Sequence, residues 1–390
     1  MSRIATLFGS SFKKQSMLMQ TLWIWQHTNW PNFHWDEQQV QPLLRSLHMD
    51  IGILIGKTGN QTDPQQSLDT LLANVLSSSA IEGETLDARS VRSSLARRIG
   101  VDEQQPYPVS DQSEGIAQIM VDAIQQANTA LTFERLCQWH QWLFPAPETM
   151  ILSRPEHIGE LRGDSPMQVV SGREDNPTVH FEAPPRDVLE SEVLGFIDWF
   201  NTSRTDSLLD PLLRAALVHL WLVTLHPFDD GNGRITRALT DMALAQADDQ
   251  SIRLYAMSVA ILERRASYYD ILERTQRGGL DITEWILWFL QTLDHTISQA
   301  QQQIDRTLAK TRFWHQFHDA GLSKEQIKVL NRLLDGGENG FEDGISAGQY
   351  QKVAKVSKAT ATRHLADLLD KGCIEKLPGG GRSTRYRISL

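Results

Sequence analysis

Residues 226–237, HPFDDGNGRITR, decide the fold and the chemistry that this sequence predicts. They follow PLLRAALVHLWLVTL (211–225), which is apolar nearly all round and therefore predicts a central buried helix. They lead into a helical run, RALTDMALAQA (237–247). A Gly-Asn-Gly turn that opens a helix exposes unpaired backbone N–H groups at the positive end of the helix dipole. The sequence thus predicts an anion site between two helices.

The side chains within this stretch suit phosphate chemistry. Arg234 and Arg237 are permanent cations that can bind phosphate oxygens bidentately, and Asp230 is a hard oxygen ligand suited to Mg²⁺ among phosphates. His226 can accept a proton near neutral pH. Together these groups indicate phosphoryl or nucleotidyl transfer, in which catalysis consists mostly of positioning and charge stabilisation.

The rest of the chain predicts a mainly α protein with a small β-hairpin. Apolar residues of QSLDTLLANVLSSSAIEGETL (66–86) recur at helical spacing, and that helix is expected to end at Gly83. MQVVSGREDNPTVHF (167–181) instead predicts an isolated hairpin, or flap, that stops at Pro184 and Pro185. From residue 283 to about 316 the pattern predicts a helix that leaves one core and bridges to another.

The last 70 residues predict a winged helix-turn-helix domain. Residues 351–390 hold nine Lys or Arg against three acidic residues, although the whole chain has a net charge of -10. Ser357 is expected to cap a helix whose polar residues suit a DNA groove. A protein docking module remains the alternative to a DNA-binding one. The candidate DNA contacts are Lys358, Thr360, Arg363, Arg382 and Arg385.

Length and composition set the domain plan. At 390 residues the chain exceeds one ordinary hydrophobic core. We expect a flexible tail over 1–20, an N-terminal helical region with an inhibitory helix over 21–110, a catalytic domain over 111–300, a helical linker over 301–318 and the winged helix over 319–390. No apolar stretch is long enough to span a bilayer, and no secretory signal is evident. Cys137 and Cys373 are far apart, so we expect buried thiols in the cytoplasm.

A family resemblance joins these features. HPFDDGNGRITR matches the Fic signature HxFx[DE]GNGRxxR at every fixed position. SSAIEG (78–83) resembles the family's inhibitory motif [ST]xxxE[GN], and SYYDILERTQRG (267–278) resembles its adenine-pocket segment. The chain is similar to Fic proteins with an N-terminal inhibitory helix, and this implies a Fic helical bundle with a hairpin flap.

The resemblance implies a protein adenylyltransferase that uses Mg²⁺ and ATP. His226 would deprotonate a Ser, Thr or Tyr hydroxyl that attacks the α-phosphate, while Asp230 would hold Mg²⁺. Asn232 and the N–H groups of Gly231 and Gly233 would cradle the triphosphate, and both arginines would neutralise the β- and γ-phosphates. Gly231 favours AMP transfer over phosphorylation. The remaining nucleotide-binding positions would be Tyr268, Tyr269 and Gln276 for adenosine and Ser171 on the flap, which would align a target peptide.

The same resemblance implies autoinhibition through Ser78, Glu82 and Gly83. Glu82 would pair with Arg237 and so block productive ATP binding, and it could also align a water for removing AMP. A homodimer is expected. The alternative is a nucleotide-responsive transcriptional regulator with little turnover, which would not need His226.

Overall fold

A computed structural model describes residues 22–58, 64–103, 105–145, 155–173, 176–247, 254–336, 341, 344–378 and 384–389. The expected tail over 1–20 lies outside these ranges. The chain forms two compact units, Met1–Ser298 and Gln299–Leu390. In both units the described residues are mainly helical, which confirms the predicted fold class, including its small hairpin.

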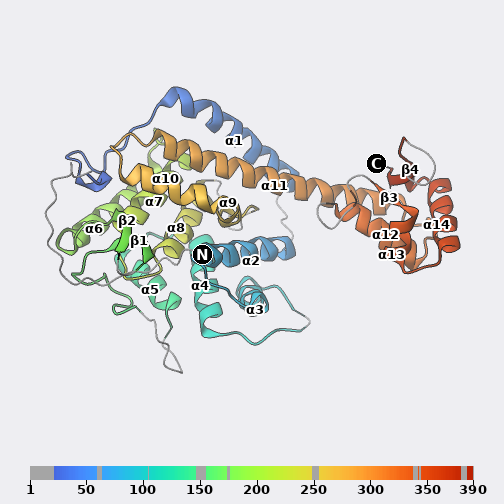
Figure 1. Ribbon diagram of the computed structural model, residues 1–390, viewed down its shortest axis with the longest axis horizontal. Coiled ribbons are helices and arrows are strands. Elements are labelled where there is room, and N and C mark those ends of the chain that lie inside the picture. The colour runs from blue at the N-terminus through green and yellow to red at the C-terminus, as the bar shows by residue number, and fades with distance from the viewer. Residues whose placement is uncertain are drawn as a thin grey trace. The chain divides into compact units, whose positions relative to one another are not determined.

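The first unit consists of helices and one hairpin, which lies to one side of the unit in Figure 1. In chain order its elements are η1 (Ile24–Gln26), α1 (Glu37–Thr58), α2 (Pro64–Ile81), α3 (Ala88–Ile99), α4 (Asp111–Gln125), α5 (Phe133–Leu143), β1 (Gln168–Arg173), β2 (Asn176–Glu182), α6 (Arg186–Thr202), η2 (Ser203–Thr205), α7 (Pro211–Leu225), α8 (Asn232–Ala247), α9 (Met257–Glu263), α10 (Arg265–Gln276) and the start of α11 (Thr283–Gln316).

Helix α7 is the centre of this unit, as the sequence predicts. Every residue from Leu212 to Leu225 is buried. The helix begins cleanly because Pro211 suits its first turn and the Asp210 carboxylate accepts the Leu212 N–H. A helix that is apolar on all sides is stable only when neighbours cover every face. Its C-terminus, where the Fic-like motif begins, is therefore fixed from several directions.

A buried amide sets the position of α2 against α8 and α9. The Asn74 side chain donates to Asp241 Oδ2 (2.7 Å) and accepts the Ser258 N–H (2.9 Å). Because Asn74 is 3% exposed, breaking these bonds would leave polar groups unpaired away from water. Ser78 lies one turn further along α2, so this anchor places the end of α2 beside α8. The chain leaves the helix at Gly83, which has a positive φ of 83°.

The hairpin of β1 and β2 is antiparallel, with Val170 opposite Val179 and Ser171 opposite Thr178. Its base is packed by Met167, Phe181 and Ala183, with Trp23 edge-on to the Phe181 ring at 5.4 Å. The aromatic segment near the N-terminus therefore covers one face of the hairpin.

The second unit contains α12 (Lys324–Asp335), β3 (Ile345–Ser346), α13 (Ala347–Ala354), α14 (Lys358–Asp370), β4 (Ile374–Lys376) and β5 (Arg385–Ile388). Its three strands pair in the order β3, β5, β4. Ser323, Ser346 and Ser357 cap the three helices by accepting backbone N–H bonds. Local sequence thus defines where each helix of this unit starts.

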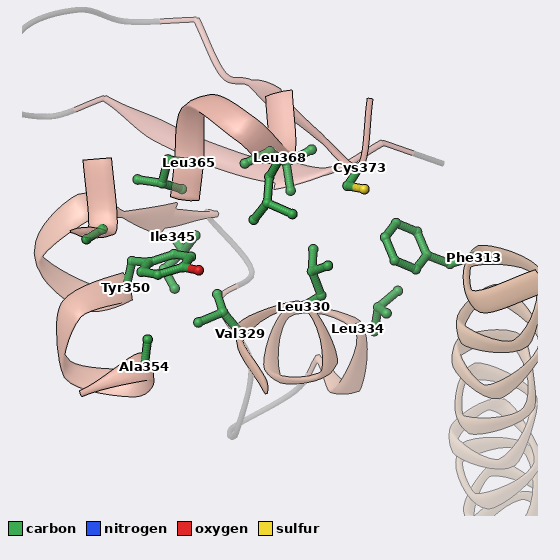
Figure 2. Packing of buried hydrophobic residues seen from close by; sticks show 12 residues of the cluster. Phe313, Val329, Leu330, Leu334, Ile345, Tyr350, Ala354, Leu365, Leu368 and Cys373 are labelled. Carbon is green, nitrogen blue, oxygen red and sulfur yellow. The ribbon is translucent and has the colours of Figure 1, made fainter. Parts of the chain in front are cut away.

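The second unit has its own hydrophobic core (Figure 2). Val329, Leu330, Tyr350 and Leu368 are fully buried in it. Figure 2 shows the Phe313 ring directed from α11 toward this cluster, and Phe313 is 2% exposed. The expected linker over 301–318 therefore contributes a core side chain, and the last turns of α11 are part of the second unit.

Replacing Phe313 by Ala is expected to destabilise the second unit by about 3–5 kcal/mol, the usual cost of deleting a buried aromatic ring. Amide hydrogen exchange in peptides of the second unit, followed in the full chain at increasing denaturant, measures the change. Arg312→Ala, at an exposed neighbouring position of the same helix, is the control and should have little effect. Equal stabilities for the two variants would contradict the packing role of Phe313.

Candidate active site

His226 lies at the sharp turn that ends α7. Its backbone is in the left-handed region, with φ 49° and ψ 59°, and its N–H caps the helix by donating to Leu222 O. Few residues other than glycine adopt this conformation, and such positions persist only where surrounding contacts hold them. Arg162 supplies those contacts, because its Nε donates to His226 O (2.9 Å) and its N–H donates to Pro227 O (3.0 Å). The 2%-exposed Arg162 also binds Pro184 O at the base of the hairpin.

The hydrogen bonding of His226 prepares its ring to act as a base. Nδ1 lies 3.1 Å from the carbonyl of Val223, which can only accept, so Nδ1 carries the proton and Nε2 keeps its lone pair. Burial lowers the pKa of His226, and Arg162 lowers it further, against opposing effects of the Val223 bond, Glu82 and Asp230. The imidazole is therefore neutral near pH 7 and able to accept a proton.

The loop between α7 and α8 is stabilised by hydrogen bonds from its own side chains. Asn232 accepts the Phe228 N–H (2.9 Å) and donates to Phe228 O (2.7 Å), so both ends of its amide brace the loop. In this state the Asn232 side chain shapes the turn, and its expected contact with phosphate stays a prediction. His140 stacks on Phe228 with ring centroids 4.2 Å apart. His140 Nδ1 accepts the Gly159 N–H, which leaves Nε2 as the donor to Asp230 O (3.2 Å).

Asp230 presents a carboxylate that fits a magnesium ion shared with phosphates. Its side chain is 59% exposed, and one oxygen accepts the Gly231 N–H at 2.5 Å. In this state that N–H is directed at Asp230. The described residues include no cluster of three or more His, Cys, Asp and Glu that could hold a metal. Mg²⁺ commonly binds through one carboxylate, waters and substrate phosphates, and Asp230 meets that requirement.

The beginning of α8 carries an ion pair between Arg237 and Glu82. Arg237 Nη2 lies 2.8 Å from Glu82 Oε1 and also donates to Ser78 O (2.8 Å), while Nε donates to Ser78 Oγ (2.9 Å). Arg237 is only 2% exposed. A Cβ on Gly233 would lie 2.1 Å from Glu82 Oε1, so the glycine lets the carboxylate approach the backbone closely. Glu82 therefore occupies the positive end of α8.

The surroundings of Glu82 favour its ionised form. Burial by itself would raise the pKa of Glu82, but Arg237, Arg234 and His226 outweigh it and hold the pKa below its usual range. The carboxylate thus stays ionised, and Arg237 stays protonated because Glu82, together with Tyr268 and Tyr269, outweighs the effect of burial on its pKa.

A second carboxylate, which the sequence analysis did not single out, pairs with the other motif arginine. Glu84 Oε2 lies 2.6 Å from Arg234 Nη1, and the Arg234 side chain is 5% exposed. Burial raises the pKa of Glu84 above its usual range, although Arg234 opposes this effect. No helical or strand periodicity marks Glu84, since it follows the end of α2 by three residues.

Both arginines keep unused donors. Arg237 Nη1 and Arg234 Nε are buried and have no hydrogen-bond partner within the described part of the chain. Buried donors normally find partners, so these unpaired ones at a helix N-terminus fit the oxygens of an anion such as phosphate.

The segment expected to bind adenosine packs behind this site. Tyr268 is 2% exposed, and its hydroxyl lies 2.9 Å from His219 Nε2, so its ring belongs to the core. The Tyr269 hydroxyl donates to Ile81 O (3.3 Å), and Gln276 donates to Thr224 Oγ1 (3.2 Å). Helix α10 thus fastens the end of α2 and the end of α7 together, which places all three residues around the motif.

Ser171 on the hairpin is linked to α10 by a chain of hydrogen bonds. Its Oγ lies 2.5 Å from His180 Nε2, and His180 Nδ1 lies 2.7 Å from Glu273 Oε2. Because the carboxylate accepts the Nδ1 proton, the serine hydroxyl donates to Nε2. Arg277 reinforces the link by donating from Nε to His180 O (3.1 Å). The flap is therefore fixed to the helix that carries the expected adenosine contacts.

The candidate DNA contacts are divided between exposed and engaged positions. Lys358 and Arg363 are exposed on α14, and Thr360 is half-buried and donates its N–H to Ser357 Oγ (3.2 Å). Arg385 donates to Gly344 O (3.0 Å) and so stabilises the sheet. Arg382 lies outside the described residues.

Comparison with known families identifies the centre of this site. Residues 130–244 match the model of the Fic/DOC family, and residues 23–101 match a domain of unknown function, DUF4172. The Fic/DOC match covers less than a third of the chain and includes the hairpin, His226 and both motif arginines. Glu82 and Glu84 lie in the DUF4172 part.

Curated relatives match over part of their length. Protein adenylyltransferase fic-1 of Caenorhabditis briggsae is 35% identical over 96 residues, which are 25% of this chain and 17% of that protein. Protein adenylyltransferase Fic of Nematostella vectensis is 31% identical over 140 residues, or 36% and 29% of the two chains. That of Drosophila willistoni is 27% identical over 228 residues, or 57% and 40%. The chain thus spans less than half the length of these relatives.

Two solved structures are similar at low identity. A Fic family protein from Desulfovibrio desulfuricans G20 gives a TM-score of 0.49 at 19% identity, covering 89% of this chain and 96% of that one. Fic-1 (residues 134–508) from C. elegans gives 0.48 at 21% identity, covering 70% and 74%.

The free thiols and the membrane prediction can also be checked. Cys137 and Cys373 are both buried and free, as predicted, and burial raises the pKa of Cys137 to about 11. Among the described residues no helix combines the length and the apolar character that a membrane crossing needs.

The buried His140 predicts acid sensitivity. Burial lowers its pKa from 6.5 to about 4, so the neutral ring contributes stability that is present above about pH 6.5 and is lost as the pH falls toward about 4. This contribution amounts to about 3 kcal/mol. His140→Gln should therefore reduce the loss of unfolding free energy between pH 7 and pH 4.5, measured by urea denaturation. His34→Gln, at an exposed site, is the control. An unchanged pH dependence in His140→Gln would contradict the prediction.

Proposed function

We propose that this protein is a protein adenylyltransferase that transfers AMP from Mg·ATP to hydroxyl groups of itself or of another protein, and that it is held inactive by its own glutamate. The observation that carries the proposal is the pairing of Arg237 with Glu82 at the N-terminus of α8, beside a neutral His226. The Fic domain and the names of the curated relatives support the same activity.

The proposed reaction uses His226 as general base. Nε2 takes the proton of a Ser, Thr or Tyr hydroxyl as its oxygen attacks the α-phosphorus, and the bond from that phosphorus to the leaving pyrophosphate oxygen breaks. The bond between Nδ1 and Val223 keeps the ring in the required tautomer throughout. Arg234, Arg237 and the N-terminus of α8 bind the phosphate oxygens.

A magnesium ion would bind at Asp230 and neutralise charge between phosphates. Asn232 and His140 contribute indirectly, because they fix the backbone on either side of Asp230. Gly231 has a φ of 79°, and a Cβ there would lie 2.5 Å from Leu143 Cδ2, so a side chain at this position would disturb the loop. The proposed contacts of Tyr268, Tyr269, Gln276 and Ser171 with nucleotide or target would require movement of α10 or the flap.

Inhibition follows from competition for the same charges. Glu82 binds the arginine that a γ-phosphate needs, and its own negative charge repels that phosphate. Two charges about 4 Å apart at an effective dielectric near 20 interact by roughly 4 kcal/mol. In this scheme Glu82 could also orient a water that removes AMP from a modified target, and a homodimer could regulate access of α2.

The second unit supports a second proposed function, which is DNA binding by a winged helix. The order helix, strand, helix, helix and two strands fits that fold. α14, with exposed Lys358 and Arg363, would be the recognition helix. Such a unit would also serve the alternative function of a nucleotide-responsive regulator, in which His226 would be dispensable.

Glu82→Gly is expected to raise AMP transfer by about 30-fold or more, since even half of the estimated pair energy corresponds to that factor. Transfer of label from α-labelled ATP to the purified chain and to a cell lysate measures it. His226→Ala added to Glu82→Gly should lower the activated rate by about 100- to 10,000-fold. Absence of label in every sample would contradict AMP transfer and favour the regulator.

Lys358→Ala combined with Arg363→Ala should weaken binding to duplex DNA and lower the slope of log affinity against log salt by about 2. Mobility shifts at several salt concentrations provide the measurement. Lys310→Ala with Arg312→Ala makes the same charge change on α11 and should leave the slope unchanged. Salt-insensitive binding, or none, would argue that this unit docks on protein.

A further inference from the structure

The end of the α2 segment presents two carboxylates to two arginines. Glu82 reaches Arg237 at 2.8 Å, and two residues later Glu84 reaches Arg234 at 2.6 Å. The positive φ of Gly83 turns the chain between them. Arg234 and Arg237 lie on the first turn and a half of α8, so both cations of the proposed phosphate site are engaged by one short stretch.

Glu84 is placed to compete with phosphate for Arg234, unlike a carboxylate in an exposed surface ion pair. Arg234 is 5% exposed and lies beneath the Phe144 ring at 5.2 Å, so its guanidinium cannot turn away to another partner in water. Its only other carboxylate contact within the described residues is Asp230 at 3.7 Å. Glu84 itself is 34% exposed, so it has room to swing outward when another anion arrives.

We propose that Glu84 is a second inhibitory carboxylate, which competes with the triphosphate of ATP for Arg234. It acts separately from Glu82, which pairs with Arg237. This inference rests on the proposed nucleotide site. ATP must displace both carboxylates to bind both arginines, so removing Glu82 alone leaves Arg234 paired with Glu84. Glu84 is then a residue that sets nucleotide affinity.

A purely structural role for Glu84 makes the opposite prediction. If the carboxylate served only to hold Arg234 in place for phosphate, its loss would weaken ATP binding or leave it unchanged. If it competes with phosphate, its loss strengthens ATP binding. The sign of the change in affinity therefore separates the two roles.

The experiment measures equilibrium binding of Mg·ATP by calorimetry to the full chain carrying His226→Ala, so that no turnover occurs. Glu84→Gln is added in the presence of Glu82 and in the Glu82→Gly background. We expect roughly tenfold tighter ATP binding in both backgrounds, which corresponds to about 1.4 kcal/mol. AMP, which lacks the β- and γ-phosphates, should bind with unchanged affinity.

Glu284→Gln is the matched control. Glu284 pairs with Arg274 at the same N–O distance of 2.6 Å, but both side chains are more than 60% exposed and lie outside the site. That variant should leave ATP affinity unchanged. Glu84→Ala gives a second test if the glutamine forms new hydrogen bonds, and thermal unfolding checks that each variant folds.

The outcomes separate this inference from the proposed function. Unchanged or weaker ATP binding in both Glu84 variants would contradict the inhibitory role of Glu84, while leaving the proposed adenylyl transfer intact. An equal gain for AMP would also overturn it, since the effect would not involve the β- and γ-phosphates. If no variant binds ATP, the proposed nucleotide site is wrong. Binding of inorganic triphosphate then tests the competition by Glu84, because Arg234 needs no adenosine to bind phosphate.

Discussion

The buried charge of Arg237 is the constraint on which the rest of the site depends. A guanidinium with 2% exposure is stable only if anions or carbonyls surround it, and in this state α2 supplies them through Ser78 and Glu82. The same requirement explains why α2 is anchored by Asn74 one turn earlier, and why α10 binds its last carbonyl. A nucleotide that displaced Glu82 would take over this stabilising role. In the proposed function, inhibition and nucleotide binding are therefore two ways of stabilising one buried cation.

The residues proposed to act in catalysis are held in place by neighbouring groups. Arg162 fixes the left-handed turn at His226, and Val223 selects the imidazole tautomer. His140 and Asn232 fix the loop that carries Asp230. Arg162, His140 and Asn232 are buried, so replacing any of these side chains leaves an unsatisfied polar group. The arrangement is preorganised for charge stabilisation, which suits a reaction in which phosphate oxygens carry the charge.

The two glutamates differ in what surrounds their arginine partners. Arg237 is 2% exposed and is bound by Glu82 and by both the hydroxyl and the carbonyl oxygen of Ser78. Arg234 is 5% exposed, and its carboxylate contacts among the described residues are Glu84 and the more distant Asp230. Burial raises the pKa of Glu84, whereas the arginines hold the pKa of Glu82 below its usual range.

Periodicity, glycine placement and a dense local motif lie within short windows, so local sequence was enough to predict the central helix, the hairpin and the turn that carries His226. A short motif also indicated Glu82. The contacts of Glu84 with Arg234, the bracing of the turn by Arg162 and His140, and the packing of Tyr268 in the core became visible only in the folded chain. These contacts join residues 49 to 150 positions apart along the chain. Pairings at that separation depend on how helices pack, which no local pattern records.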